Sequence, residues 1–118
     1  MSNRILLISE PGLDGVFRHV ESVIYFLLEN GVEVDLAYSS KRGSAQLSAL
    51  IQKVESSGGE TLDLKTANSP SFTDLSAYRR LYAFAKRRRP SVTHSHSSKA
   101  GGLARLLPRS VSGQVFYT

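Results

Sequence analysis

The chain has no cysteine in its 118 residues and no long apolar run. Without cysteine, a disulfide framework and a thiolate metal site are both excluded, which suits a cytoplasmic protein. The apolar start Ile5–Ile8 ends at Glu10 and Pro11, so no signal peptide is predicted. No apolar stretch reaches the ~20 residues that a membrane-spanning helix needs. We therefore expect a cytoplasmic protein, with peripheral contact at the inner face of the membrane left open.

What is present is a composition typical of one globular domain. Hydrophobic residues make up 41% of the chain and charged residues 21%, which argues against disorder. The net charge of +5 favours anionic partners such as phosphates or acidic lipids. Much of the positive charge lies in Arg79–Arg80 and Lys86–Arg89. Such a run also suits the solvated C-terminal end of a helix, and this explanation stays open.

Apolar residues recur with two spacings. The unbroken run Ile5–Ile8 is typical of a parallel strand covered on both faces. Val16–Glu29 shows the spacing of an amphipathic helix, and Asn30–Gly31 predicts its end. Together these patterns predict strands at Arg4–Ser9, Val32–Tyr38, Thr61–Leu64, Ser91–His94 and Gln114–Thr118, and helices at Val16–Glu29, Ser44–Val54, Asp74–Arg89 (with Asp74 as N-cap) and Ser98–Leu107.

Strands that alternate with helices predict a parallel sheet with right-handed crossovers. We expect one α/β domain over residues 1–118: a doubly wound, Rossmann-like, five-stranded parallel sheet of order 3-2-1-4-5 with helices on both faces. Ligands bind such sheets at the carboxyl ends of the strands, where the strand order reverses. In this order the final strand, Gln114–Thr118, is an apolar edge, which predicts a homodimer or aggregation through it.

The first candidate site is the turn before the first helix. Gly12, Asp14 and Gly15 lie in this turn, and glycines there let backbone amides approach an anion. His19 follows one turn into the helix, where an imidazole can donate or accept a hydrogen bond. A plain strand-to-helix turn explains the loop residues as well, and a surface or capping histidine remains the alternative explanation for His19.

The second candidate site follows the fourth strand. His94 and His96 fall on one side of that strand because side chains alternate along it. Ser98 and Lys99 come next, at the start of a helix, and suit a hydroxylated or anionic ligand. A serine N-cap is the ordinary explanation for this start and can hold as well. Two histidines without a third ligand at metal spacing predict no metal site.

Several other chemistries are poorly supported. The first turn matches neither the dinucleotide fingerprint nor a phosphate loop with its lysine, and no serine occupies a nucleophile elbow. The arginine run lacks interleaved aromatic residues, so nucleic-acid binding is not expected. Asp63 lies within a strand rather than after it, which argues against a phosphoacceptor domain.

Four segments resemble the amino-terminal domain of family 4 glycosyltransferases, which are retaining enzymes with two Rossmann-like domains (the GT-B fold). The resemblance spans the chain and is most specific at His94–Gly101. It is closest to members that build bacterial capsule or exopolysaccharide on lipid-linked acceptors. The matching segments are Asp14–Val20, Gly31–Asp35, Pro90–Gly101 and Phe116–Thr118.

This resemblance implies roles for single residues. It implies that His96 lies near the donor sugar, as the catalytic candidate, with His94 beside it. His19 and the loop residues would bind acceptor or donor, and no cofactor or metal is expected. The acceptor- and donor-binding residues would be Gly12, Asp14, Gly15, His19, His94, His96, Ser98 and Lys99.

The resemblance also implies a function for the intact parent enzyme. A hexose would pass from a UDP- or GDP-sugar to a polysaccharide or lipid-linked acceptor. The nucleotide-sugar domain would be absent from this chain, so we expect the 118 residues alone to be inactive. The alternative function is a non-catalytic module that binds a protein or an anionic membrane. Its candidate membrane-surface residues are Arg79, Arg80, Lys86, Arg87, Arg88 and Arg89.

Overall fold

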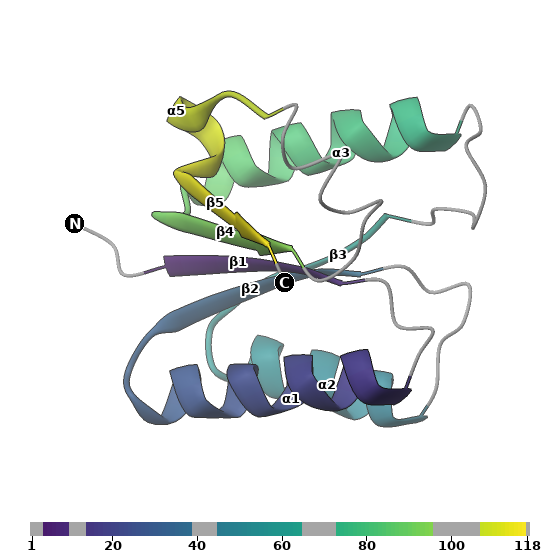
Figure 1. The fold of residues 1–118 in the computed structure, drawn as a ribbon, viewed down its shortest axis with the longest axis vertical. Coiled ribbons are helices and arrows are strands. Elements are labelled where there is room, and N and C mark those ends of the chain that lie inside the picture. The colour runs from purple at the N-terminus through teal and green to yellow at the C-terminus, as the bar shows by residue number, and fades with distance from the viewer. Residues whose placement is uncertain (1–3, 10–13, 39–44, 65–72, 96–106, 118) are drawn as a thin grey trace.

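The computed structural model describes residues 4–9, 14–38, 45–64, 73–95 and 107–117, in which strands and helices alternate (Figure 1). The strands are β1 (Arg4–Ser9), β2 (Glu33–Tyr38), β3 (Thr61–Asp63), β4 (Val92–Ser95) and β5 (Gln114–Tyr117), and the helices are α1 (Asp14–Glu29), α2 (Ala45–Ser56), α3 (Thr73–Arg88) and α5 (Arg109–Ser112).

The strands form one sheet in the order β3-β2-β1-β4-β5, and all four strand pairs are parallel. The predicted α/β class with a parallel sheet is therefore confirmed. The chain winds from β1 to β3 in one direction and continues from β4 to β5 in the other. The order thus reverses between β1 and β4, which are paired neighbours.

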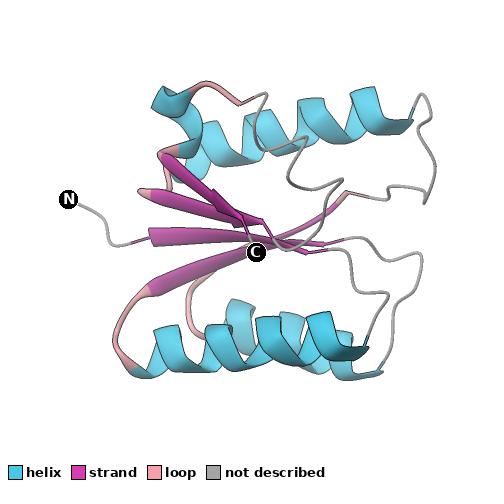
Figure 2. Ribbon diagram, viewed as in Figure 1, coloured by secondary structure: helices cyan, strands magenta, loops and turns pink. Residues whose placement is uncertain are grey.

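Helices cover both faces of the sheet (Figure 2). Helices α1 and α2 lie on one face, and α3 and α5 lie on the other. Each face has its own apolar core because successive residues of a strand point to opposite sides. Leu7, Val20, Ile24, Val34, Leu36, Leu47, Leu50 and Val54 are buried on the α1–α2 face, and Leu6, Ile8, Ala37, Leu64, Ala77, Leu81, Phe84, Ala85 and Leu107 on the α3 face.

The ends of two helices follow from backbone chemistry. Helix α1 stops at Asn30–Gly31, as predicted, and Gly31 adopts the left-handed conformation with φ of 75°. Its N–H bonds to the Leu28 carbonyl, which satisfies one of the carbonyls left over at the helix end. Helix α3 stops before Pro90, which follows Arg89 at a φ of 51°.

Most of the predicted elements differ from the structure by one or two residues at an end, and three of these differences matter for the site or for helix capping. Asp74 lies inside α3, which begins at Thr73, so it is not the N-cap. Helix α1 begins at Asp14, which moves Asp14 and Gly15 from the predicted turn into the first helical turn. Strand β4 extends to Ser95 because Ser95 pairs with Ile8 of β1, and no local pattern signals that pairing.

The segment between β4 and β5 was predicted less well. Most of the predicted helix Ser98–Leu107 lies outside the described residues, and Leu107 itself is buried but not helical. The short helix α5 was not predicted. Pro108 precedes it as the N-cap residue, so the proline that ends one predicted helix starts another.

Candidate functional site

Two histidines meet where the strand order reverses. His94 is paired with Leu7 of β1, so both side chains lie on the α1–α2 face of the sheet. His19 lies on α1, which starts beyond the carboxyl end of β1, and it is exposed. The two imidazoles are near enough for their charges to interact. Of the predicted site residues that the structure describes, it therefore brings His19 and His94 together.

The environment of His94 favours its neutral form. Burial lowers the pKa of the imidazole from its ordinary value of 6.5, and the neighbouring charge of His19 lowers it further. A neutral imidazole has one donor and one acceptor nitrogen. At neutral pH His94 can therefore form directional hydrogen bonds to an uncharged ligand, whereas it adds little to the attraction of an anion.

Two further hydroxyl-bearing residues lie at this end of the sheet, and the sequence patterns did not single them out. Ser9 ends β1 and is only 4% exposed, and it is paired with Tyr38 at the end of β2. Burial raises the pKa of Tyr38, and the nearby carboxylates of Asp63 and Glu55 raise it further, so the phenol stays protonated. In the sequence, only the alternation of side-chain directions along β1 could have indicated on which face of the sheet Ser9 lies.

Only some of the remaining predicted site residues lie in the part of the chain that the structure describes. Asp14 and Gly15 lie in the first turn of α1. Within the described ranges there is no group of three or more His, Cys, Asp or Glu residues that could hold a metal ion. Four other predicted site residues lie outside the described residues: Gly12 in the first loop, and His96, Ser98 and Lys99 after β4.

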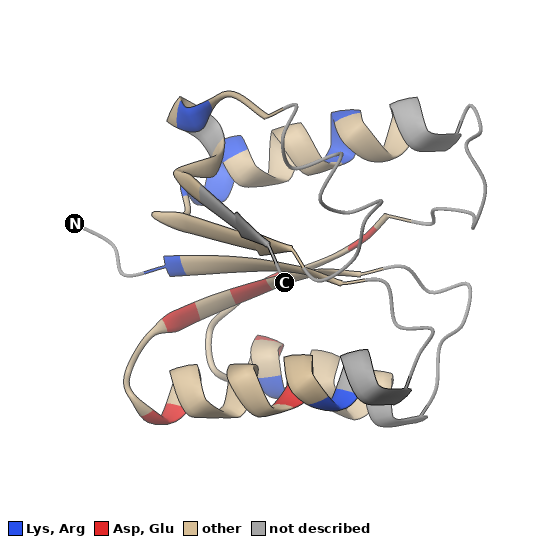
Figure 3. Ribbon diagram, in the orientation of Figure 1, with Lys and Arg blue, Asp and Glu red and all other residues tan. Residues whose placement is uncertain are grey.

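The opposite end of the sheet holds a network of ion pairs that the sequence did not indicate. Figure 3 shows basic and acidic stretches of the ribbon of β1, β2 and α3 at this end. The Asp35 carboxylate of β2 is fully buried and accepts two hydrogen bonds from Arg88 of α3, at 2.9 and 3.0 Å. Arg88 also pairs with Glu60 at 2.8 Å, and Arg4 lies 3.8 Å from Asp35. The network joins β1, β2 and the segment before β3 to the C-terminal end of α3.

This network changes the interpretation of the basic run. Arg88, with 16% of its side chain exposed, is held by Asp35, whose hydrogen bond raises its pKa. Arg87 pairs with Glu60 at 2.9 Å, and Arg80 donates to the main-chain carbonyls of Asp63 and Leu64. These three arginines therefore serve contacts within the domain.

The other three basic candidates form an exposed group on and just after α3. Arg79, Lys86 and Arg89 are exposed, and none of them forms an ion pair within the described residues. Lys86 lies two turns after Arg79 along the helix, so the two side chains share one stripe. Across the described part of the chain, no helix combines the length and apolar character required to span a membrane.

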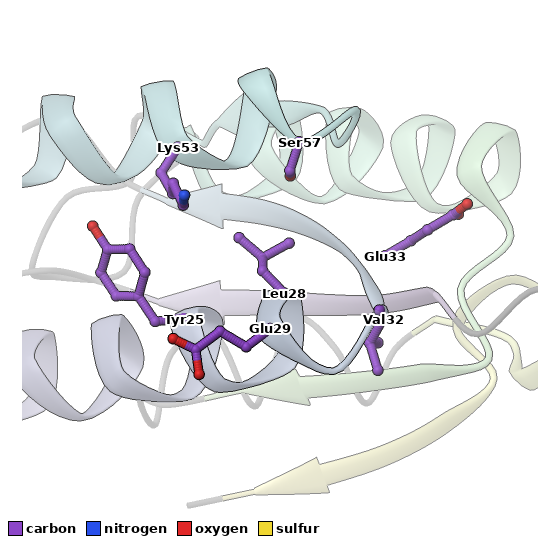
Figure 4. A pocket seen from close by; sticks show the side chains of 8 residues that line it. Tyr25, Leu28, Glu29, Val32, Glu33, Lys53 and Ser57 are labelled. Atoms are coloured by element: carbon purple, nitrogen blue, oxygen red, sulfur yellow. The ribbon is translucent and has the colours of Figure 1, made fainter.

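A shallow groove of about 440 Å³ lies away from the histidines, between the C-terminal ends of α1 and α2 (Figure 4). Lys53 lies 5.9 Å from the centre of the Tyr25 ring, a cation–π contact, and Glu33 at the rim pairs with Arg4. Because these charged groups already have partners, we assign no ligand to the groove. It is lined by Tyr25, Leu28, Glu29, Gly31, Val32, Glu33, Lys53 and Ser57.

The histidine pair is therefore the candidate site, since it joins polar side chains from β1, α1 and β4 at the reversal of strand order. Comparison with protein-family models and with curated proteins finds no match for this chain.

Proposed function

We propose that this chain is the acceptor-side, doubly wound Rossmann-like domain of a nucleotide-sugar-dependent retaining glycosyltransferase. The observation that carries the proposal is the proximity of His19 and His94 at the reversal of strand order in a parallel sheet. The resemblance of His94–Gly101 to family 4 enzymes supports it independently.

In the proposed reaction a hexose passes from a UDP- or GDP-sugar to a hydroxyl group of a saccharide or lipid-linked acceptor, with retention of configuration. Neutral His94 binds sugar hydroxyls, and His19 borders the same site from α1. His96 is the candidate nearest the donor sugar. Catalysis depends on positioning the reactants and on stabilising the departing diphosphate. A second, nucleotide-sugar domain would complete the cleft, so we expect no sugar transfer by the 118 residues alone.

The test is a histidine-selective NMR titration of the folded chain. The probes are methyl glycosides of glucose, galactose and mannose, followed by UDP-glucose and GDP-mannose. We expect the His19 and His94 signals to shift together with one dissociation constant for at least one probe, and His94→Ala to weaken that binding. Arg109→Gln, a change on the opposite face of the sheet, is the matched control. If no probe shifts either signal up to its solubility limit, the proposal is wrong.

A second candidate function rests on the exposed cations Arg79, Lys86 and Arg89. These could hold the domain on an anionic membrane by electrostatic attraction. Vesicles of phosphatidylcholine with and without phosphatidylglycerol provide the test. We expect salt-sensitive co-sedimentation only with the anionic vesicles, lost when all three residues are changed to Gln but kept in Arg18→Gln on α1. Absence of binding by the unmodified chain at low salt would exclude this function.

A further inference from the structure

Two aromatic side chains lie on the outer face of helix α1, whose opposite face packs Val20 and Ile24 into the core. Phe26 is 64% exposed and Tyr25 is 38% exposed, although the outer face of an amphipathic helix normally carries polar residues. Among the described residues, no other large apolar side chain is exposed to this extent. A single exposed apolar residue is ordinary on a protein surface, so the residues around this pair decide what the surface binds.

The two rings belong to a stripe that has opposite charges at its two ends. Exposed residues recur three or four positions apart along α1, so they lie on one face of the helix. Figure 3 shows a basic segment near the start of α1 and an acidic segment at its end. We call this set the outer stripe, and it consists of Arg18, Ser22, Tyr25, Phe26 and Glu29.

Contacts within the domain explain neither charge of the outer stripe. Arg18 and Glu29 take part in none of the ion pairs among the described residues. A helix dipole favours anions near the start of a helix and cations in its last turn, and the outer stripe has the reverse arrangement. The two charges lie about 16 Å apart along the helix axis, too far to pair with each other. Both charges therefore suit a partner outside the domain.

A second α1 helix that runs antiparallel to the first carries the complementary pattern. It brings Arg18 of each copy opposite Glu29 of the other, so a twofold axis forms the same contact twice. In this register Ser22 of one copy lies opposite Tyr25 of the other. The small side chain of Ser22 leaves room for the aromatic rings, which lose exposed apolar surface when the helices pair. A parallel pair of helices would bring like charges together instead.

We propose that the outer stripe is a self-complementary surface through which two copies of this chain pair, with their α1 helices antiparallel. An anionic membrane fits this surface less well, because it attracts cations and repels the carboxylate of Glu29. The outer stripe lies across the sheet from α3 and does not include the β5 edge, so the pairing does not depend on the proposed sugar site or on the exposed cations of α3 (Figure 1). Few side chains of each copy take part, compared with the roughly 20–30 residues a side of a stable interface, so the dimer is transient.

The experiment captures the transient dimer with a short bis-maleimide cross-linker. The chain has no cysteine, so Ser22→Cys provides a single thiol close to the expected twofold axis. Every variant also carries Val115→Lys, which prevents pairing of β5 edges from bringing two copies together. Ser76→Cys is the matched control, because Ser76 is exposed as well but lies on α3, across the sheet. We expect Ser22→Cys to form cross-linked dimers severalfold faster than Ser76→Cys.

Charge reversal tests the antiparallel register. In the Ser22→Cys chain, Arg18→Glu or Glu29→Arg places two pairs of like charges across the twofold axis. Each change should slow cross-linking about fivefold, since exposed ion pairs are individually weak but two of them change sign. A mixture of the two reversed chains, one of them isotopically labelled, should regain the original rate, with most dimers formed between unlike chains. Phe26→Gln should also slow cross-linking because it removes the exposed ring.

The outcomes separate this pairing from other forms of self-association. If Ser22→Cys cross-links no faster than Ser76→Cys, the outer stripe does not pair and the proposal is wrong. If the reversed chains, shown to be folded by circular dichroism, keep the original rate, or if their mixture stays slow, the contact between Arg18 and Glu29 is overturned. Any of these failures leaves the proposed sugar site untouched, because no saccharide enters the measurement.

Discussion

Replacing Arg88 by methionine tests the buried ion pair most directly. The change keeps a long side chain at the end of α3 but removes both hydrogen bonds to Asp35, at 2.9 and 3.0 Å. The Asp35 carboxylate is fully buried, so water cannot replace the lost donors. Its remaining partners are the backbone N–H of Glu60, at 2.9 Å, and the more distant Arg4.

The expected cost follows from this geometry. Removing one member of a buried ion pair costs about 3–5 kcal/mol because the other charge stays buried and unpaired. For a domain of 118 residues, each kcal/mol lowers the unfolding temperature by roughly 3–5 °C, so the expected fall is about 10–20 °C. The double variant Asp35→Leu/Arg88→Met removes both charges, and we expect it to recover most of the lost stability.

Urea unfolding of the unmodified chain, the two single variants and the double variant gives the coupling free energy between the two residues. Lys86→Met is the matched control, because Lys86 lies on the same helix but is exposed; we expect a change within about 0.5 kcal/mol. If Arg88→Met is no more destabilising than Lys86→Met, or if the two single effects simply add, the reasoning about the buried pair is refuted.

Three other predictions concern a turn, a histidine and an edge strand. Gly113→Ala should destabilise the chain in urea unfolding by more than Gly31→Ala does. Both glycines have positive φ, 68° and 75°, but an added Cβ would lie 2.2 Å from a backbone oxygen at Gly113 and would meet nothing within 4 Å at Gly31. Equal losses of stability would contradict this steric argument. Folding lowers the pKa of His94 from its ordinary value of 6.5, so the contribution of neutral His94 to stability is present above pH 6.5 and is lost as the pH falls below that value. The free energy of unfolding should therefore fall less on acidification in His94→Gln than in the unmodified chain. An identical pH dependence of the two proteins would refute this prediction. Strand β5 is an edge strand of uncharged residues, so the chain should self-associate as its concentration rises in sedimentation velocity. Val115→Lys should suppress this self-association. An unmodified chain that stays monomeric at high concentration would disprove the prediction.

The fold class was predictable because it rests on local periodicity and on the chirality of strand connections. The run Ile5–Ile8 and the helical spacing of Val16–Glu29 are visible in the sequence and were confirmed in the structure. Boundaries were less predictable, since they depend on partners far along the chain. The end of β4 at Ser95 is one case, because it depends on the pairing of Ser95 with Ile8, which lies 87 residues earlier in the chain.

The candidate site was predictable in the same partial way. His19 and His94 could be expected to meet, because parallel strands bring their carboxyl ends to one edge of the sheet. Ser9 carried no composition signal, and only its burial and its place on the face shared with Leu7 distinguish it from other serines. Gly12, His96, Ser98 and Lys99 lie outside the described residues, so their roles stay predictions.

By itself, the order of apolar and polar residues determined that strands and helices alternate, and hence that the sheet is parallel, because hydrophobic spacing and helix-ending residues act over a few neighbouring positions. Only the tertiary structure decided what the basic run does. The same string of arginines could face solvent or the interior, and the buried carboxylate of Asp35 across the domain draws Arg88 inward while Lys86 stays exposed. Burial and pairing between distant segments settle such questions, and no local pattern contains them.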